Sequence, residues 1–257
     1  MKIPSTPKEK VPSNPESIAV SRSGELADLI QHFGSKQSIE DFYLWLNEIS
    51  SLSESFENNK KVQEETVKAL KSAIRMFGER RAFADMLFVL DELQVLQKRF
   101  PEIESYQVDL GEAFSIAIYY LRGSWDTEGT SFLLKKLRDI IHANPDNKLL
   151  KIHYAKSYSN AINRFCSDRH NFTCDKLLFE IRMFANKHRD EEDVQYEFAQ
   201  SLTSVIGTFA RENRTDELEH ILEELRRIAS KFPESEKIQL LLTRGTILSS
   251  LVSNRNE

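Results

Sequence analysis

Residues 90–96 read LDELQVL, and this seven-residue pattern returns every 44 residues along the chain. Its first, fourth and seventh positions are apolar in all five copies, which are LNEISSL at 46–52, LDELQVL at 90–96, LKKLRDI at 134–140, LFEIRMF at 178–184 and LEELRRI at 222–228. Steps of three residues place these side chains on one face of a helix. Leu recurring by chance in the first column has odds of about one in ten thousand. The sequence therefore predicts one helix that is repeated five times.

A second apolar pattern follows the same 44-residue step and predicts a second helix in each repeat. Its columns include Ile74, Ile118, Ile162 and Ile206. Small residues occupy a neighbouring column, which holds Ala69, Ala113, Ser157, Ser201 and Gly245. Small side chains let an adjacent helix approach closely. Each repeat is therefore predicted to be a pair of antiparallel helices.

Turn-forming residues mark where the predicted helices end. Pro101, Pro145 and Pro233 each follow the end of an apolar run and precede an acidic residue, a pattern that ends one helix and begins the next. Gly or Asn lies at the other junctions, where it suits the left-handed residue that closes a helix. The prediction is an all-α chain without strands and with eleven helices, at about 17–33, 37–56, 61–77, 82–99, 105–121, 126–143, 149–165, 170–187, 193–209, 214–231 and 237–252.

The two ends of the chain differ in composition from the repeats. Residues 1–15 hold four of the seven Pro residues and lack an apolar run, so we expect a disordered tail. Residues 16–253 are predicted to form a single solenoid of five helical hairpins and a C-terminal capping helix at about 237–252. Thr243, Thr246 and Ser249 replace apolar residues in that last helix, and a solenoid needs a polar outer face at its end.

The spacing after the Pro residues resembles the tetratricopeptide-repeat (TPR) pattern, in which a Leu-Gly-x-x-Tyr element marks the first helix of a unit. The matching positions are Leu110, Gly111 and Phe114 after Pro101, and Tyr154, Ala155 and Tyr158 after Pro145. The unit here is 44 residues rather than 34, and the family's usual Trp and Ala-rich second helix are missing. Residues 17–252 therefore resemble a TPR-like solenoid with longer helices.

This resemblance implies a right-handed α-α superhelix in which the first helix of each unit lines a concave groove for a peptide or helix of a partner protein. The residues expected to line the groove are Lys68, Val108, Glu112, Ile152, Lys156, Asn160, Tyr196 and Gln200. Val108, Ile152 and Tyr196 share one column, so they either line adjacent rungs of the groove or pack inside as core. The cationic clamp that some TPR proteins use for a carboxyl terminus is not matched, since Glu112 and Gln200 take its places.

The predicted function is a non-catalytic protein-protein interaction scaffold or adaptor without a cofactor. No short catalytic or phosphate-binding motif is present. The alternative is a nucleic-acid-binding helical repeat, which the net charge of −5 disfavours although Lys135, Lys136 and Arg138 form a basic run. The later repeats are acidic, and Glu197 in them is interpreted as part of a solvated helix face. A second copy could pair through the first helix, at Ile18, Leu26 and Leu29.

One local cluster could bind a metal. Cys166, His170 and Cys174 lie at four-residue steps and could bind zinc with a fourth ligand such as Asp168 or His188. The alternative, which we favour, is that both Cys residues are small buried side chains and that no metal binds. The sequence shows no export signal and no membrane-spanning run, so we expect a cytoplasmic protein with reduced thiols.

Overall fold

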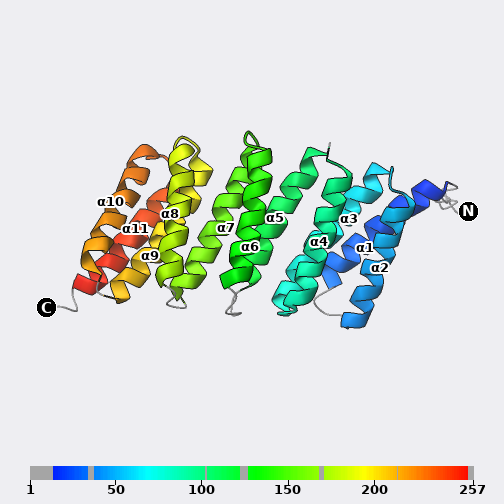
Figure 1. The fold of residues 1–257 in the computed structure, drawn as a ribbon, viewed down its shortest axis with the longest axis horizontal. Helices are drawn as coiled ribbons and strands as arrows, with labels where there is room; N and C mark the ends of the chain where they lie inside the picture. The colour runs from blue at the N-terminus through cyan, green and yellow to red at the C-terminus, as the bar shows by residue number, and fades with distance from the viewer. Residues whose placement is uncertain are drawn as a thin grey trace, which may run out of the picture. The chain divides into compact units, whose positions relative to one another are not determined.

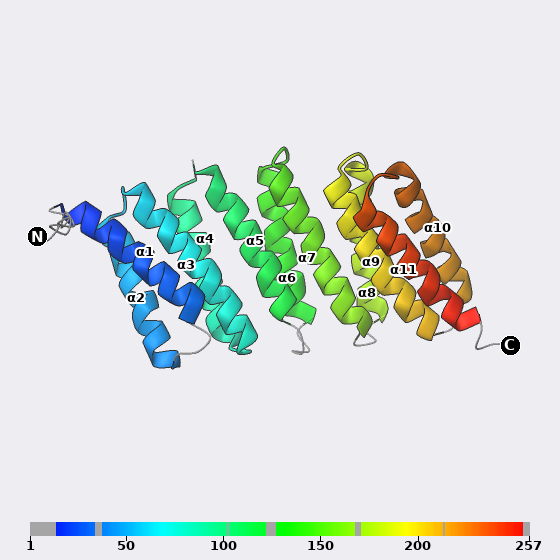
Figure 2. The same ribbon diagram turned by 180° about the vertical axis from the view of Figure 1, so that it is seen from behind.

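The computed structural model describes residues 14–33, 38–101, 103–121, 127–167, 171–212 and 214–253 (Figures 1 and 2). The regular structure in these ranges is entirely helical, which confirms the all-α class. The helices are α1 (Pro15–Phe33), α2 (Ile39–Ser55), α3 (Lys60–Glu79), α4 (Phe83–Arg99), α5 (Glu104–Tyr120), α6 (Thr127–Ala143), α7 (Lys148–Ser167), α8 (Asn171–Lys187), α9 (Glu192–Arg211), α10 (Thr215–Lys231) and α11 (Glu236–Ser253).

The helices form two compact units, which divide between Arg99 and Phe100. In unit 1, α3 packs against α1, α2 and α4. In unit 2, the odd-numbered helices α5, α7, α9 and α11 pack side by side as one layer, which faces the viewer in Figure 2. The even-numbered helices α6, α8 and α10 form the second layer, and each packs on the two odd-numbered helices beside it in sequence (Figure 1). These contacts are those of a helical repeat.

The predicted apolar columns form the core of both units. Ile74, Ile118, Ile162 and Ile206 are each at most 1% exposed. The small-residue column is also buried, and it allows the close approach that the sequence predicts. At Gly245 of α11, an added Cβ would lie 2.9 Å from Cδ2 of Leu225 and 3.1 Å from Cδ1 of Ile206. A side chain at this position would therefore have to displace the ends of the Leu225 and Ile206 side chains, which fill this space.

A recurring glutamine, which the sequence analysis did not single out, joins α2 to α3, α8 to α9 and α10 to α11. Gln63, Gln195 and Gln239 lie a multiple of 44 residues apart near the start of an odd-numbered helix. Each donates from Nε2 to two carbonyls at the end of the preceding helix, ten and seven residues earlier, at 2.8 and 3.2 Å for Gln63, 2.8 and 3.3 Å for Gln195, and 2.9 and 3.1 Å for Gln239. The last carbonyls of a helix have no donor within it. The glutamine supplies one.

Replacing Gln63 with Leu should cost about 1–3 kcal/mol of stability, because the carbonyls of Ser53 and Phe56 lose their donor. Gln63 is fully buried, whereas Gln239 is half-buried and water can reach its surroundings. Gln239→Leu should therefore cost less than Gln63→Leu. Urea unfolding followed by circular dichroism measures both losses, and equal losses would contradict the role that we assign to burial.

Arginine side chains link the even-numbered helices of unit 2 in the same register. Arg138 of α6 donates to Glu180 of α8 at 2.6 Å, and Arg182 of α8 donates to Glu224 of α10 through both ends of its guanidinium at 2.9 Å. Arg138 also donates to the hydroxyl of Tyr158 on α7 at 2.8 Å. The layer of even-numbered helices is therefore held together by charge-assisted hydrogen bonds as well as by the core.

Candidate partner-binding surface

Four side chains in one column line the outward side of the odd-numbered helices of unit 2. Val108 of α5, Ile152 of α7 and Tyr196 of α9 are half-buried, and Leu240 of α11, which the sequence analysis missed, is 69% exposed. We call these four residues the apolar row. The sequence left open whether this column lines a groove or belongs to the core. Each of the four side chains keeps surface in contact with solvent, unlike the fully buried Ile118 column.

Polar contacts show that residues about 44 apart meet across neighbouring helices of this layer. Asn147 donates to Glu104 at 2.9 Å, Lys237 donates to Asp193 at 2.8 Å, and Asn160 donates to the carbonyl of Ser115 at 3.5 Å. These pairs join α5 to α7 and α9 to α11. The 44-residue step in the sequence is therefore the register of the helices in space, and members of the apolar row lie on adjacent helices at equivalent heights.

The remaining predicted groove residues follow the apolar row along the same helices, with one exception. Glu112, Lys156 and Gln200 each lie one helical turn beyond a residue of the apolar row. Glu112 and Gln200 are half-buried, and Lys156 is exposed. Arg244 of α11 is the fourth residue of this column, and it is also exposed. Asn160 lies one turn further along α7. Lys68 belongs to unit 1, where its ammonium group pairs with Asp28 of α1 at 3.0 Å.

An ion-pair cluster lies on the other side of the apolar row and fixes its aromatic member. Lys237 of α11 lies over the ring of Tyr196, 5.1 Å from the ring centroid, while it pairs with Asp193 at 2.8 Å and Glu192 at 3.7 Å. The hydrogen bond from Lys237 lowers the pKa of Asp193. Lys148 of α7 adds a contact to Asp193 at 3.5 Å. The ring of Tyr196 is therefore held by a cation–π contact with Lys237, and the ion pairs with Asp193 and Glu192 keep Lys237 in place.

Glu197, next to Tyr196, is the residue whose environment departs most from the sequence interpretation. It was interpreted as a solvated helix-face acid, but it is only 8% exposed. Burial raises the pKa of Glu197 to about 7, although the positive charges of Lys156 and Lys237 act in the opposite direction. Its carboxylate makes neither a hydrogen bond nor an ion pair within the described part of the chain. An acid of this kind is costly to bury without a partner.

Large apolar side chains are also exposed on the even-numbered helices. Leu44 and Phe88 of unit 1 are 66% and 63% exposed, and Phe132 of unit 2 is 55% exposed. These three residues are 44 apart, so the repeat register could have revealed them. In unit 2, Phe179 and Met183 of α8 are exposed to a similar degree. Phe132 supplies a matched control for the odd-numbered face, since it is an exposed aromatic residue on the other layer.

The last helix is less polar on its outer side than the prediction of a polar cap required. Thr243 and Thr246 are exposed as expected, but Ile247 is 55% exposed and Leu240 is more exposed still. In α1, Ile18 is 53% exposed, whereas Leu26 is fully buried inside unit 1 and cannot offer surface to a second copy.

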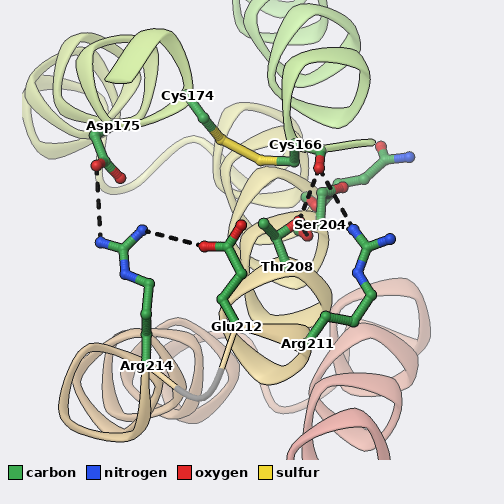
Figure 3. The surroundings of a disulfide bond; sticks show 9 residues. Cys166, Cys174, Asp175, Ser204, Thr208, Arg211, Glu212 and Arg214 are labelled. Atoms are coloured by element: carbon green, nitrogen blue, oxygen red, sulfur yellow. Dashed lines mark hydrogen bonds and ion pairs between the residues drawn. A yellow bond between two sulfur atoms is a disulfide. The ribbon is translucent and has the colours of Figure 1, made fainter. Parts of the chain in front are cut away.

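Cys166 and Cys174 form a disulfide, which contradicts the expectation of reduced thiols (Figure 3). The end of α7 and the start of α8 bring their Cα atoms to 5.9 Å, within the usual range for a disulfide. The bond consumes both sulfur atoms that the zinc hypothesis needed as thiolates. His170 and Asp168 lie outside the described residues. His188, the other proposed ligand, donates from Nδ1 to the carboxylate of Glu191 at 2.9 Å.

The disulfide lies at a corner where four helices are tied together. The carbonyl of Cys166 accepts from Thr208 of α9 at 3.2 Å and from Arg211 at 3.4 Å (Figure 3). Arg214, just before α10, pairs with Asp175 of α8 at 3.7 Å and lies over the ring of Phe209. Covalent and polar links therefore tie the end of α7 to the start of α8 and the end of α9.

Reducing this disulfide should lower the free energy of unfolding by about 2.5 kcal/mol, the cost expected for opening a loop of this short length. Urea unfolding with and without dithiothreitol measures the difference. The Cys166→Ala/Cys174→Ala variant is the control, because reductant should leave its stability unchanged. Two free thiols in the purified, unreduced protein would contradict the pairing.

Comparison of the chain with known protein families, with characterised proteins and with solved structures finds no match. No helix in the described ranges combines the length and the apolar character needed to cross a membrane.

Proposed function

We propose that this protein is a non-catalytic interaction scaffold or adaptor, and that the odd-numbered face of unit 2 binds a segment of a partner protein. TPR-like stacking of the hairpins along a right-handed superhelix is part of the same proposal, because the repeat register and the packing of odd-numbered helices in one layer support it. The binding surface consists of the apolar row with Glu112, Lys156, Asn160 and Gln200 beside it.

The observation that carries this proposal is the partial exposure of one apolar column across four adjacent helices. Other apolar columns of these helices are closed by packing; Phe114, Tyr158 and Leu202, for example, are fully buried. A row of aromatic and aliphatic side chains with a polar border is typical of the anchoring part of a protein interface. A peptide or helix laid across α5, α7, α9 and α11 would bury this row.

A protein segment fits this surface better than a nucleic acid does. Glu112, Glu192 and Asp193 lie close to the row together with Lys156 and Lys237, so the surface carries both signs of charge. A phosphate backbone needs converging positive charge, and the net charge of the chain is −5. We therefore propose a protein partner.

Selection of peptides from a phage-displayed library of random dodecapeptides tests the proposal. The wild-type protein should enrich a common family of peptides. Ile152→Asp places a charge in the middle of the row and should weaken their binding by at least about tenfold, the effect of losing an interface anchor. Phe132→Asp, a matched change on the even-numbered layer, should leave binding unchanged. Circular dichroism establishes that both variants are folded. Failure of the wild-type protein to enrich any peptide, or equal loss in the two variants, would contradict the proposal.

A further inference from the structure

Glu197 lies at the edge of the proposed binding surface, and its carboxylate has no hydrogen-bond or ion-pair partner among the residues that the structure describes. It is 8% exposed, it follows Tyr196 of the apolar row directly, and it lies on α9 between α7 and α11. Buried polar groups nearly always have hydrogen-bond partners, and an exception calls for a reason. A bound molecule that supplies the missing partner of the carboxylate would be such a reason.

The nearby cations do not satisfy this carboxylate. Lys237 of α11 acts on Glu197 through its charge, but its ammonium group is committed to Asp193 and Glu192. Lys156 of α7 also acts on Glu197 through its charge, yet it is exposed and forms no ion pair with any residue that the structure describes. Glu197 is therefore left as an acceptor that no side chain in the described ranges fills.

We propose, on the basis of the proposed function, that the partner segment carries a lysine or arginine side chain whose cationic group pairs with Glu197 while apolar neighbours pack on Tyr196 and Ile152. A long basic side chain suits this place because its aliphatic stem can lie along the apolar row and its charged end can reach the carboxylate. Pairing removes most of the cost of burying the charge, so the contact favours a basic residue over a neutral one at this position of the partner.

This pairing makes binding depend on pH. Burial raises the pKa of Glu197 to about 7, so its ionised fraction rises about tenfold between pH 6 and pH 8. The other charges that act on it are Lys156 from α7, Lys237 from α11 and Asp193 from α9 itself. No charged group of α8 or α10, as far as these helices are described, acts on Glu197. His153 of α7 holds the equivalent position 44 residues earlier.

The test compares peptides selected from the random dodecapeptide library by two forms of the protein. The wild-type protein should enrich peptides with Lys or Arg next to aliphatic or aromatic residues. Glu197→Gln, which keeps the size of the side chain and removes its charge, should select peptides without that basic preference.

The affinity of a peptide selected by the wild-type protein is then measured by fluorescence anisotropy at pH 6 and pH 8. Binding to the wild-type protein should be up to about tenfold tighter at pH 8, and binding to Glu197→Gln should change much less, because that variant lacks the ionising carboxyl group. Peptides that bind without a basic residue, or a basic preference that survives in Glu197→Gln, would overturn this inference and leave the proposed function standing. Absence of any selected peptide would instead contradict the proposed function.

Discussion

Replacing Phe114 with Ala should lower the free energy of unfolding by about 3–5 kcal/mol, the range for removing a fully buried aromatic side chain. Phe114 lies on α5 and has no exposed surface. Its removal leaves a cavity between helices whose backbones are held in register by hydrogen bonds, so the site cannot collapse fully. Urea unfolding followed by circular dichroism at 222 nm measures the loss.

Phe132→Ala is the matched control for this prediction. It removes the same side chain 18 residues away, on α6, where the ring is 55% exposed. Its loss should stay within about 0.5 kcal/mol, as is usual for surface substitutions. The contrast tests the two-layer packing, because exchange of the helix faces would reverse the two effects. Similar losses for the two variants would show that the layers are assigned wrongly.

Glu197→Gln should stabilise the protein at pH 8 by up to about 3 kcal/mol and have little effect at pH 4.5. Burial raises the pKa of Glu197 from 4.5 to about 7. In this situation the folded protein binds the proton more tightly than the unfolded chain does. The wild-type protein therefore loses stability as the pH rises from about 4.5 to 7, and the loss levels off above pH 7. The glutamine variant lacks this ionisation and avoids the loss.

The quantity to measure is the difference in unfolding free energy between Glu197→Gln and the wild-type protein at each pH, because other titrating groups cancel in it. The difference should grow between pH 4.5 and 7. The same measurement on Glu192→Gln, a change of the same kind at an exposed position of α9, is the control. A constant difference for Glu197→Gln across this range would contradict the burial of an unpaired carboxylate.

The periodicity of the sequence was sufficient to predict the helices and the core. Apolar residues at steps of three and four identify a helix face, and their 44-residue recurrence identifies which helices are equivalent. For that reason the Ile118 column and the small residues such as Ser157 are buried as predicted. Turn residues placed the helix ends to within a few residues, because Pro and Gly act locally on the backbone.

The contacts between repeats could not be predicted in the same way. Gln63 and Glu197 are polar residues, and periodicity alone does not show how closely a neighbouring helix covers them. Gln63 is buried because it caps the preceding helix, and Glu197 is buried between α7 and α11. The disulfide was missed because the expected redox state rested on an absent export signal rather than on the short distance between Cys166 and Cys174.

The candidate surface was predicted in part. Val108, Ile152 and Tyr196 share one column, and the structure places them on adjacent helices with partial exposure. Leu240 continues the column but was overlooked, because α11 was interpreted as a polar cap from its Thr and Ser residues. Lys68 also lies on an odd-numbered helix, but that helix, α3, belongs to unit 1.

Methyl-resolved NMR of the protein with a peptide selected from the library tests the central claim most directly. Val108, Ile152 and Leu240 carry methyl groups on three helices of the odd-numbered face, and Met183 carries an exposed methyl group on α8. We predict that the peptide shifts the signals of Val108, Ile152 and Leu240 and leaves that of Met183 in place. A shift at Met183 with unchanged signals from the other three would contradict the claim that partners bind on the odd-numbered face.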